Sequence, residues 1–209
     1  TGNGFGGSNP APNKFYVNQG DGTFVDMAEQ YGLASTLMCR SLHAADYDKD
    51  GYTDIYVVNI NNVNHFYKNN AGTGFENVYQ SSGTLDTGVG MGSIFFDYDN
   101  DGDQDLYLTH DANQTNKLYR NNGNGTFINL AFMSGLNYQG NCMGVDVADI
   151  NHDGWLDLYI TDLYPSAMFL NECDGSFEDI SISSGTNDSG IEMLFQILQR
   201  CHRIFKGRP

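Results

Sequence analysis

Three short acidic runs, about 51 residues apart, carry the side chains best suited to chemistry in this chain. Each run places an oxygen-bearing side chain at its first, third, fifth and ninth positions and a glycine at the sixth. Oxygen ligands at this spacing, around a glycine turn, are what a hard cation such as calcium requires. We name the runs loop one (residues 46–54), loop two (97–105) and loop three (149–157). Their repetition predicts a repeat array in which each unit holds one calcium ion, about three Ca²⁺ in all.

The charge of the chain is dominated by these runs. The 209 residues include 10 basic and 26 acidic side chains, for a formal net charge of −16. Such a balance argues against a nucleic-acid-binding surface. Without metal, the clustered carboxylates would repel one another. No apolar stretch approaches the length of about 18 residues that a membrane-spanning helix needs.

A second motif repeats with the same spacing. It combines an asparagine after a Tyr-x or Phe-x pair with a Gly-x-Phe or Gly-Phe turn, and its asparagines are Asn18, Asn69, Asn121 and Asn171. Aromatic and β-branched residues fill the segments between these turns, which is typical of short strands. A period near 50 built from strands and tight turns favours a propeller blade over a helical solenoid.

The repeats predict an all-β fold, a β-propeller of four-stranded blades that is only partial. Residues 1–12 form a Gly/Asn/Pro-rich segment, 13–193 contain the repeats, and 194–209 form an atypical basic tail. The tail indicates a foreign segment, a frame change or an exon end. The predicted units are half of a blade at about 13–26, blade one at about 37–79, blade two at about 88–130, blade three at about 140–180, and an aborted unit at 185–193.

The wording of the repeats resembles the FG-GAP/VCBS family, the calcium-loop propeller repeat of integrin α subunits. Asn-Lys-Leu-Tyr-Arg-Asn-Asn-Gly-Asn-Gly-Thr-Phe (116–127) and Asp-Tyr-Asp-Asn-Asp-Gly-Asp-Gln-Asp-Leu-Tyr-Leu (97–108) are most similar to secreted bacterial members associated with ASPIC/UnbV segments. The resemblance covers about 13–193. It implies that the metal loops join the first two strands of each blade and lie on one face.

The resemblance also implies the metal ligands. Side chains at the first, third, fifth and ninth positions would bind the ion, with a backbone carbonyl from the seventh. The implied residues are Asp46, Asp48, Asp50, Tyr52 and Asp54; Asp97, Asp99, Asp101, Asp103 and Asp105; and Asp149, Asn151, Asp153, Trp155 and Asp157. The extra acid at Asp103 predicts that loop two depends most on metal. All three loops lack the twelfth-position glutamate of an EF-hand, which excludes that motif.

The number of blades does not decide whether this chain closes a propeller ring by itself. Members of the family usually have six to eight blades, and an open propeller would expose strand edges, which natural sheets avoid. The chain is therefore expected to be part of a longer propeller, or to be completed by another chain. A self-closed ring of four blades is the less favoured alternative.

The remaining reactive residues do not form a catalytic pattern. The five histidines fall at unrelated places in the repeat, and no nucleophile, base and phosphate-loop motif stands apart from the acidic runs. Cys39 and Cys142 hold equivalent positions seven residues before their loops, so buried free thiols are favoured over a disulfide. The sequence leaves the redox state of Cys173 and Cys201 open.

These observations predict a non-catalytic calcium-binding module, secreted or on the cell surface. Calcium would be structural, and loops on the opposite face would bind a protein or glycan ligand or other subunits of an assembly. The alternative is an accessory part of a secreted carbohydrate-active enzyme or lectin. A nucleic-acid partner and a membrane-spanning role are not expected.

Overall fold

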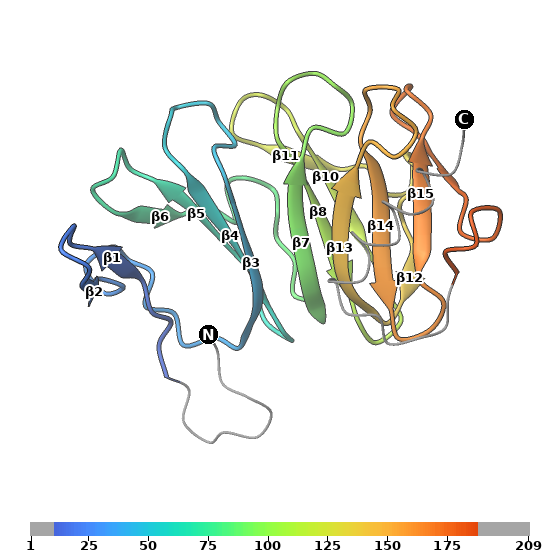
Figure 1. Cartoon of the computed structure of the whole chain (residues 1–209). Coiled ribbons are helices and arrows are strands. Elements are labelled where there is room, and N and C mark those ends of the chain that lie inside the picture. The colour runs from blue at the N-terminus through green and yellow to red at the C-terminus, as the bar shows by residue number, and fades with distance from the viewer. Residues whose placement is uncertain (1–10, 188–209) are drawn as a thin grey trace.

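The computed structural model describes residues 11–187, which form strands and turns and contain no α-helix (Figure 1). Blade one consists of β3 (Cys39–Ala45), β4 (Asp54–Asn59), β5 (His65–Asn69) and β6 (Phe75–Asn77). Blade two consists of β7 (Gly90–Phe96), β8 (Asp105–His110), β10 (Lys117–Asn121) and β11 (Phe127–Asn129). Blade three consists of β13 (Cys142–Ala148), β14 (Asp157–Asp162), β15 (Ala167–Asn171) and β16 (Phe177–Asp179).

Each blade is an antiparallel sheet whose strands are paired in chain order. The prediction of an all-β fold with four-stranded blades is confirmed, and the strands of each blade lie within the predicted ranges. The predicted half-blade is the hairpin of β1 (Tyr16–Asn18) and β2 (Phe24–Asp26). The N-terminal ten residues, most of the unit at 185–193 and the tail at 194–209 lie outside the described residues. Within 11–187, no helix is long and apolar enough to cross a membrane.

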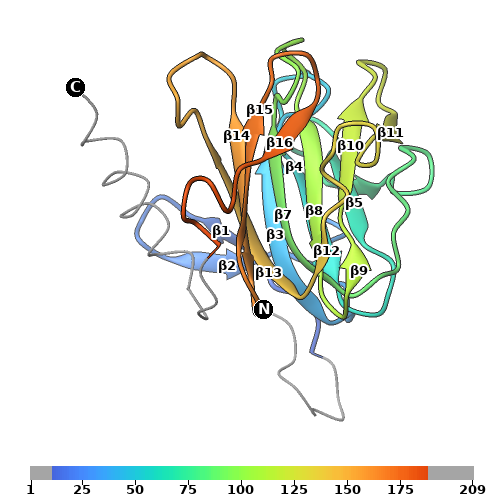
Figure 2. The ribbon, with the colours of Figure 1, turned by 90° about the vertical axis from the view of Figure 1, so that its right-hand side faces the viewer.

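The blades stand side by side in a row. Strand β7 contacts both β3 and β13, so the first strands of the three blades are neighbours, as Figure 1 shows. Figure 2 shows the later strands of each blade spreading away from this inner layer. The β1–β2 hairpin and blade three lie at opposite ends of the row. Residues 11–187 thus form an open series of propeller blades.

The core lies between adjacent blades. Successive residues of a strand face opposite sides of its sheet, and β7 illustrates the result: Phe95 packs with the cluster between blades one and two, and Phe96 with the cluster between blades two and three. Both side chains are buried. At the open end of the row, Leu42 on β3 is 63% exposed. A blade is therefore buried where another blade covers it, and apolar side chains remain exposed where none does.

A short additional sheet joins blade two to the segment that leads into blade three. It pairs β9 (Gln114–Thr115) with β12 (Gln139–Gly140). Figure 2 places it at the lower edge, whereas the β3–β4, β7–β8 and β13–β14 loops lie along the upper edge in Figure 1. The three acidic loops therefore share one face, and the β9–β12 sheet lies near the other.

Candidate metal centre

The first aspartate of each loop holds the turn by accepting backbone hydrogen bonds. In loop one, Asp46 accepts the N–H of Asp50 at 3.1 Å and of Gly51 at 2.9 Å. The glycine has a φ of 88°, a conformation that side chains other than glycine rarely adopt. The same pair of bonds recurs at Asp97 and Asp149. The glycine in the motif is thus explained by the backbone of the turn.

The ninth aspartate of each loop is buried at the start of the second strand. In loop one, Asp54 accepts the N–H of Asn69 at 2.7 Å and of Tyr47 at 3.2 Å. Asp105 and Asp157 make the equivalent pairs of bonds in their blades. Burial raises the pKa of Asp54 to about 6 and that of Asp105 to about 8, although these amides act in the opposite direction. A buried carboxylate of this kind is protonated more readily than an exposed one unless a cation lies beside it.

Two of the loops bring carboxylates close enough to share a metal ion. Asp46, Asp48 and Asp50 each offer an oxygen within 4.8 Å of the others, as do Asp97, Asp99 and Asp105. The third-position carboxylates are the most informative. Oδ1 of Asp48 and Oδ1 of Asp99 are buried and have no hydrogen-bond partner. Buried oxygens without donors are uncommon in folded proteins and need an explanation, for which an ion is one candidate.

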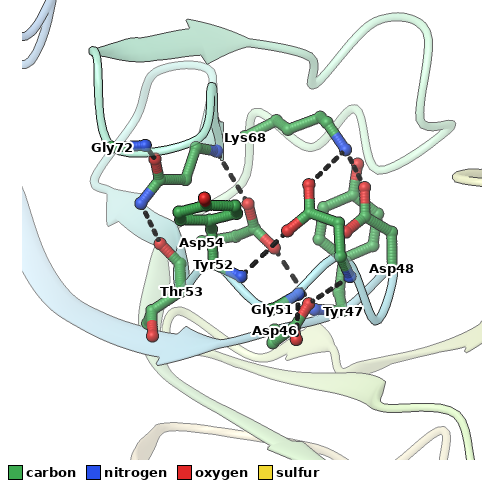
Figure 3. Close-up of polar contacts among 11 residues, drawn as sticks. Asp46, Tyr47, Asp48, Gly51, Tyr52, Thr53, Asp54, Lys68 and Gly72 are labelled. Carbon is green, nitrogen blue, oxygen red and sulfur yellow. Dashed lines mark hydrogen bonds and ion pairs between the residues drawn. The ribbon is translucent and has the colours of Figure 1, made fainter.

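A lysine partly neutralises loop one. Lys68, on β5, forms an ion pair with Asp48 and reaches Oδ2 of Asp50 at 3.2 Å. Figure 3 shows its ammonium group directed at Asp48. Arg120 holds the same place in blade two, where its Nη2 lies 3.4 Å from Oδ1 of Asn122. Loop one therefore carries its own cation at two of the predicted ligands.

Loop three differs at its third position. The amide of Asn151 donates to Oδ2 of Asp153 at 2.7 Å, so one predicted ligand binds another. The seventh residues of the loops donate their N–H to the fifth aspartate rather than turning a side chain inward. Tyr52, Asp103 and Trp155 make these bonds at 2.9, 2.8 and 2.8 Å.

Neighbouring loops are joined directly. Nζ of Lys49 in loop one lies 2.6 Å from Oδ1 of Asp103 in loop two. The side chain of Asn121 donates to the carbonyl of Tyr47 in loop one at 2.8 Å, and Asn171 donates to the carbonyl of Tyr98 in loop two at 2.9 Å. Two asparagines of the second motif thus link blades two and three to the loop of the preceding blade.

Comparison with known proteins identifies the repeat. The family model of the FG-GAP-like repeat matches residues 5–57, 46–108 and 97–160. The chain belongs to the FG-GAP-like repeat family. It is 28% identical to Cartilage acidic protein 1 of Homo sapiens over 161 residues, which is 72% of this chain and 24% of that protein. The Mus musculus protein has the same identity over 161 residues, covering 72% of this chain and 25% of its own length. The chain therefore spans about a quarter of the length of these relatives.

Among solved structures, an Agrocybe aegerita lectin is similar over 78% of this chain and 45% of its own. Its TM-score is 0.47, with 22% sequence identity, and its title describes recognition of non-reducing terminal N-acetylglucosamine. A Photorhabdus luminescens Tc holotoxin pore is similar over 82% of this chain and 8% of its own, with a TM-score of 0.38 and 17% identity.

The cysteines of the FG-GAP-like repeats occupy the predicted places. Cys39 and Cys142 open β3 and β13, where Gly90 opens β7. Both are free thiols, as is the exposed Cys173, and Cys201 lies outside the described residues. Burial raises the pKa of Cys142 to about 12.

Two features of the FG-GAP-like repeats were missed in the sequence. Lys68 belongs to the second motif but was not assigned to the metal loop. His110 is buried and contacts Asp86, a pairing that the scattered positions of the histidines in the sequence do not indicate. The position of His110 in the repeat does carry a signal for this site. His110 ends β8, and polar residues also end the equivalent strands, Asn59 in β4 and Asp162 in β14. This position therefore holds a polar residue in every complete blade.

Proposed function

We propose that this chain is a non-catalytic, calcium-stabilised propeller module of an extracellular protein. It serves as a scaffold that presents a protein- or glycan-binding surface. The observation that carries the calcium assignment is the pair of buried, partnerless oxygens on Asp48 and Asp99. Each lies in a loop whose other carboxylates are held inward by backbone amides. The donor set consists of oxygen atoms, which suits calcium.

Within each loop, the side chains at positions one, three, five and nine would hold the ion, together with the carbonyl at position seven. A bound ion neutralises the carboxylates and ties the first strand of the blade to the second. Three divalent ions supply 3 × 2 = 6 positive charges and reduce the formal charge from −16 to −10. The protein's own part is to preorganise the ligands through the Asp46-type turn and the buried Asp54-type carboxylate.

The extracellular assignment rests on the loops and on the relatives. Fully oxygen-lined loops with exposed edges suit the high calcium concentration outside cells. The relatives bear the name Cartilage acidic protein 1, and this chain shares their acidity, with a net charge of −16. Because the chain spans about a quarter of those proteins, we propose its role as that of one module.

Thermal unfolding with calcium, magnesium or a chelator tests the proposal. At calcium concentrations about 100-fold above the dissociation constant, each site should add about 2.7 kcal/mol to the free energy of unfolding. Calorimetric titration should give about three ions per chain. Asp99→Asn should remove one of these ions, whereas Asp111→Asn, outside the loops, should remove none. An identical melting temperature in calcium and chelator would refute the metal assignment.

A further inference from the structure

A polar pocket lies on the face opposite the metal loops. Strand β8 begins in loop two at Asp105 and ends at His110, so its far end marks the other edge of blade two. The pocket at this end has a volume of about 640 Å³ and is lined by Asp86, His110, Gln114, Lys117 and Gln139, among others. This volume falls within the range of small-molecule sites, about 300–1,000 Å³.

A buried carboxylate–imidazole pair forms the inner wall. Nε2 of His110 lies 3.0 Å from Oδ1 of Asp86, and the N–H of Gly88 donates to the same oxygen at 3.0 Å. Both bonds end on Oδ1, which leaves Oδ2 for a further donor. The side chain of His110 is 2% exposed, and its buried Nδ1 has no hydrogen-bond partner. Burial raises the pKa of Asp86, but the bonds from His110 and Gly88 outweigh it and leave the pKa below its usual value.

The segment that carries Asp86 is fixed from both sides. Toward blade one, the carbonyl of Asp86 accepts the N–H of Asn64 at 3.0 Å. Toward blade two, the side-chain oxygen of Gln114 accepts the N–H of Val89 at 2.8 Å. A Cβ at Gly88 would lie 2.5 Å from that oxygen and 2.7 Å from the ring of His110. The wall is therefore rigid before any ligand arrives, which lowers the entropic cost of binding.

Blade two differs here from its neighbours. In blade one, the side chain of Asn59 donates to the carbonyl of Val63 at 2.8 Å, and in blade three Asp162 accepts the N–H of Tyr164 at 2.9 Å. Both side chains thus bond within their own hairpins, although Oδ1 of Asn59 has no partner and Asp162 also accepts from Sγ of Cys142. His110 instead contacts Asp86, which comes from the connection preceding its blade. The pocket is therefore not a general consequence of the repeat.

The lining specifies the class of ligand. Asp86 and Lys117 carry opposite charges, and the other polar groups are amides and hydroxyls that both donate and accept hydrogen bonds. A phosphate or sulfate site would need several cations or converging N–H groups. At the rim, Leu85 is 58% exposed and offers an apolar surface. This combination matches a ligand with many hydroxyls and a C–H face.

We infer that the pocket beside the Asp86–His110 pair binds a neutral sugar, as a terminal unit of a glycan. The inference rests on the proposed binding function and assigns that function to this pocket. In the bound state, Oδ2 of Asp86 accepts from a sugar hydroxyl. Nε2 of Gln114 donates to a neighbouring hydroxyl and Oε1 of Gln139 accepts from another, because the other atom of each amide already bonds to the backbone. Lys117 contributes a single donor.

Glycan binding by the full chain in calcium tests the inference. An array of immobilised glycans with different terminal sugars identifies the preferred unit, and calorimetry with that free monosaccharide measures affinity. Asp86→Ala and His110→Asn should each weaken binding by at least about tenfold, because each removes or misplaces a hydrogen-bonding group. Lys117→Gln should weaken it by less than about threefold. The matched control is Asp162→Asn, at the position of His110 in blade three, which should leave affinity unchanged.

Each other outcome overturns the inference. Binding that survives both Asp86→Ala and His110→Asn, in variants with normal melting temperatures, places the site elsewhere. Binding of inorganic sulfate that Lys117→Gln abolishes identifies an anion site. No binding of any glycan, or of free monosaccharides at about 10 mM, excludes a sugar site of useful affinity. The calcium-dependent melting of the same samples reports separately on the module itself, so the two proposals fail independently.

Discussion

Loop one and loop two share the same aspartates at positions one, three, five and nine but balance their charge differently. Loop one has Lys68 on Asp48 and Asp50. Loop two has a fifth aspartate, Asp103, which is turned toward Lys49 of loop one. The equivalent of Lys68 in blade two is not paired with the loop-two carboxylates. Two loops with identical ligand motifs can therefore differ in their need for metal, because residues outside the motif supply part of the positive charge.

The largest expected difference between the two loops is the loss of stability on replacing the ninth aspartate. Asp105→Ala leaves the buried N–H groups of Tyr98 and Asn121 without an acceptor, at about 1–3 kcal/mol each, and removes a predicted ligand. Asp54→Ala has the same local effect but leaves a loop that Lys68 already neutralises in part. In calcium, urea unfolding should show a larger loss for Asp105→Ala than for Asp54→Ala. Equal losses would mean that Lys68 does not substitute for metal.

The pH dependence of the metal-free protein should separate the same two aspartates. Their folded pKa values, about 8 for Asp105 and about 6 for Asp54, lie above the usual value of an unfolded aspartate. The folded state therefore binds more protons, so the free energy of unfolding should fall as pH rises from about 4 to about 8. In chelator, Asp105→Asn should remove the fall between about pH 6 and 8. A fall of the same size in this variant would contradict the assignment.

Removing the tethered cation should strengthen calcium binding at loop one. Lys68→Met frees the carboxylates of Asp48 and Asp50, and we expect about tenfold tighter binding at one site. Without calcium, the same variant should be less stable because the carboxylates repel. Arg120→Met, at the matching position of blade two, should change affinity by less than about threefold. Calorimetric titration of both variants with calcium measures these changes in affinity.

The smallest expected difference in stability concerns the second-motif asparagines of blades one and two, Asn69 and Asn121. The side chain of Asn121 donates to Tyr47 and to Gln104, whereas that of Asn69 donates to Thr53 alone. Asn121→Ala should therefore cost about 1 kcal/mol more than Asn69→Ala, the usual contribution of one hydrogen bond. Denaturant unfolding at fixed calcium measures the difference. If the two variants match, the bond between the blades adds nothing.

Repetition explains what the sequence could predict. Strand ranges, blade size and the loop face follow from motifs that recur with one period, because a repeated unit must place equivalent residues in equivalent positions. Blade three, expected at about 140–180, runs from β13 (Cys142–Ala148) to β16 (Phe177–Asp179). The positions of Cys39 and Cys142 were predictable for the same reason.

Features that depart from the repeat could not be predicted in this way. The Asp86–His110 contact joins two residues of different segments. The position of His110 is polar in every complete blade, but its partner Asp86 belongs to no motif that recurs. Lys68 recurs as Arg120 and then as Leu170, so its pairing with loop one depends on reach and side-chain direction rather than on sequence. Such contacts are decided by packing between elements, which a single sequence does not encode as a pattern.

The bonds from Asn121 and Asn171 have a direction along the chain. Each is donated by a later blade to the carbonyl of an earlier loop. During synthesis, the earlier loop emerges first, and its carbonyl can bond only to water until the next blade arrives. Loops one and two therefore reach their final hydrogen bonding one blade later than their own strands. Folding of such an array propagates from neighbour to neighbour, and a ribosome that pauses after a loop leaves that loop waiting for the blade that completes it.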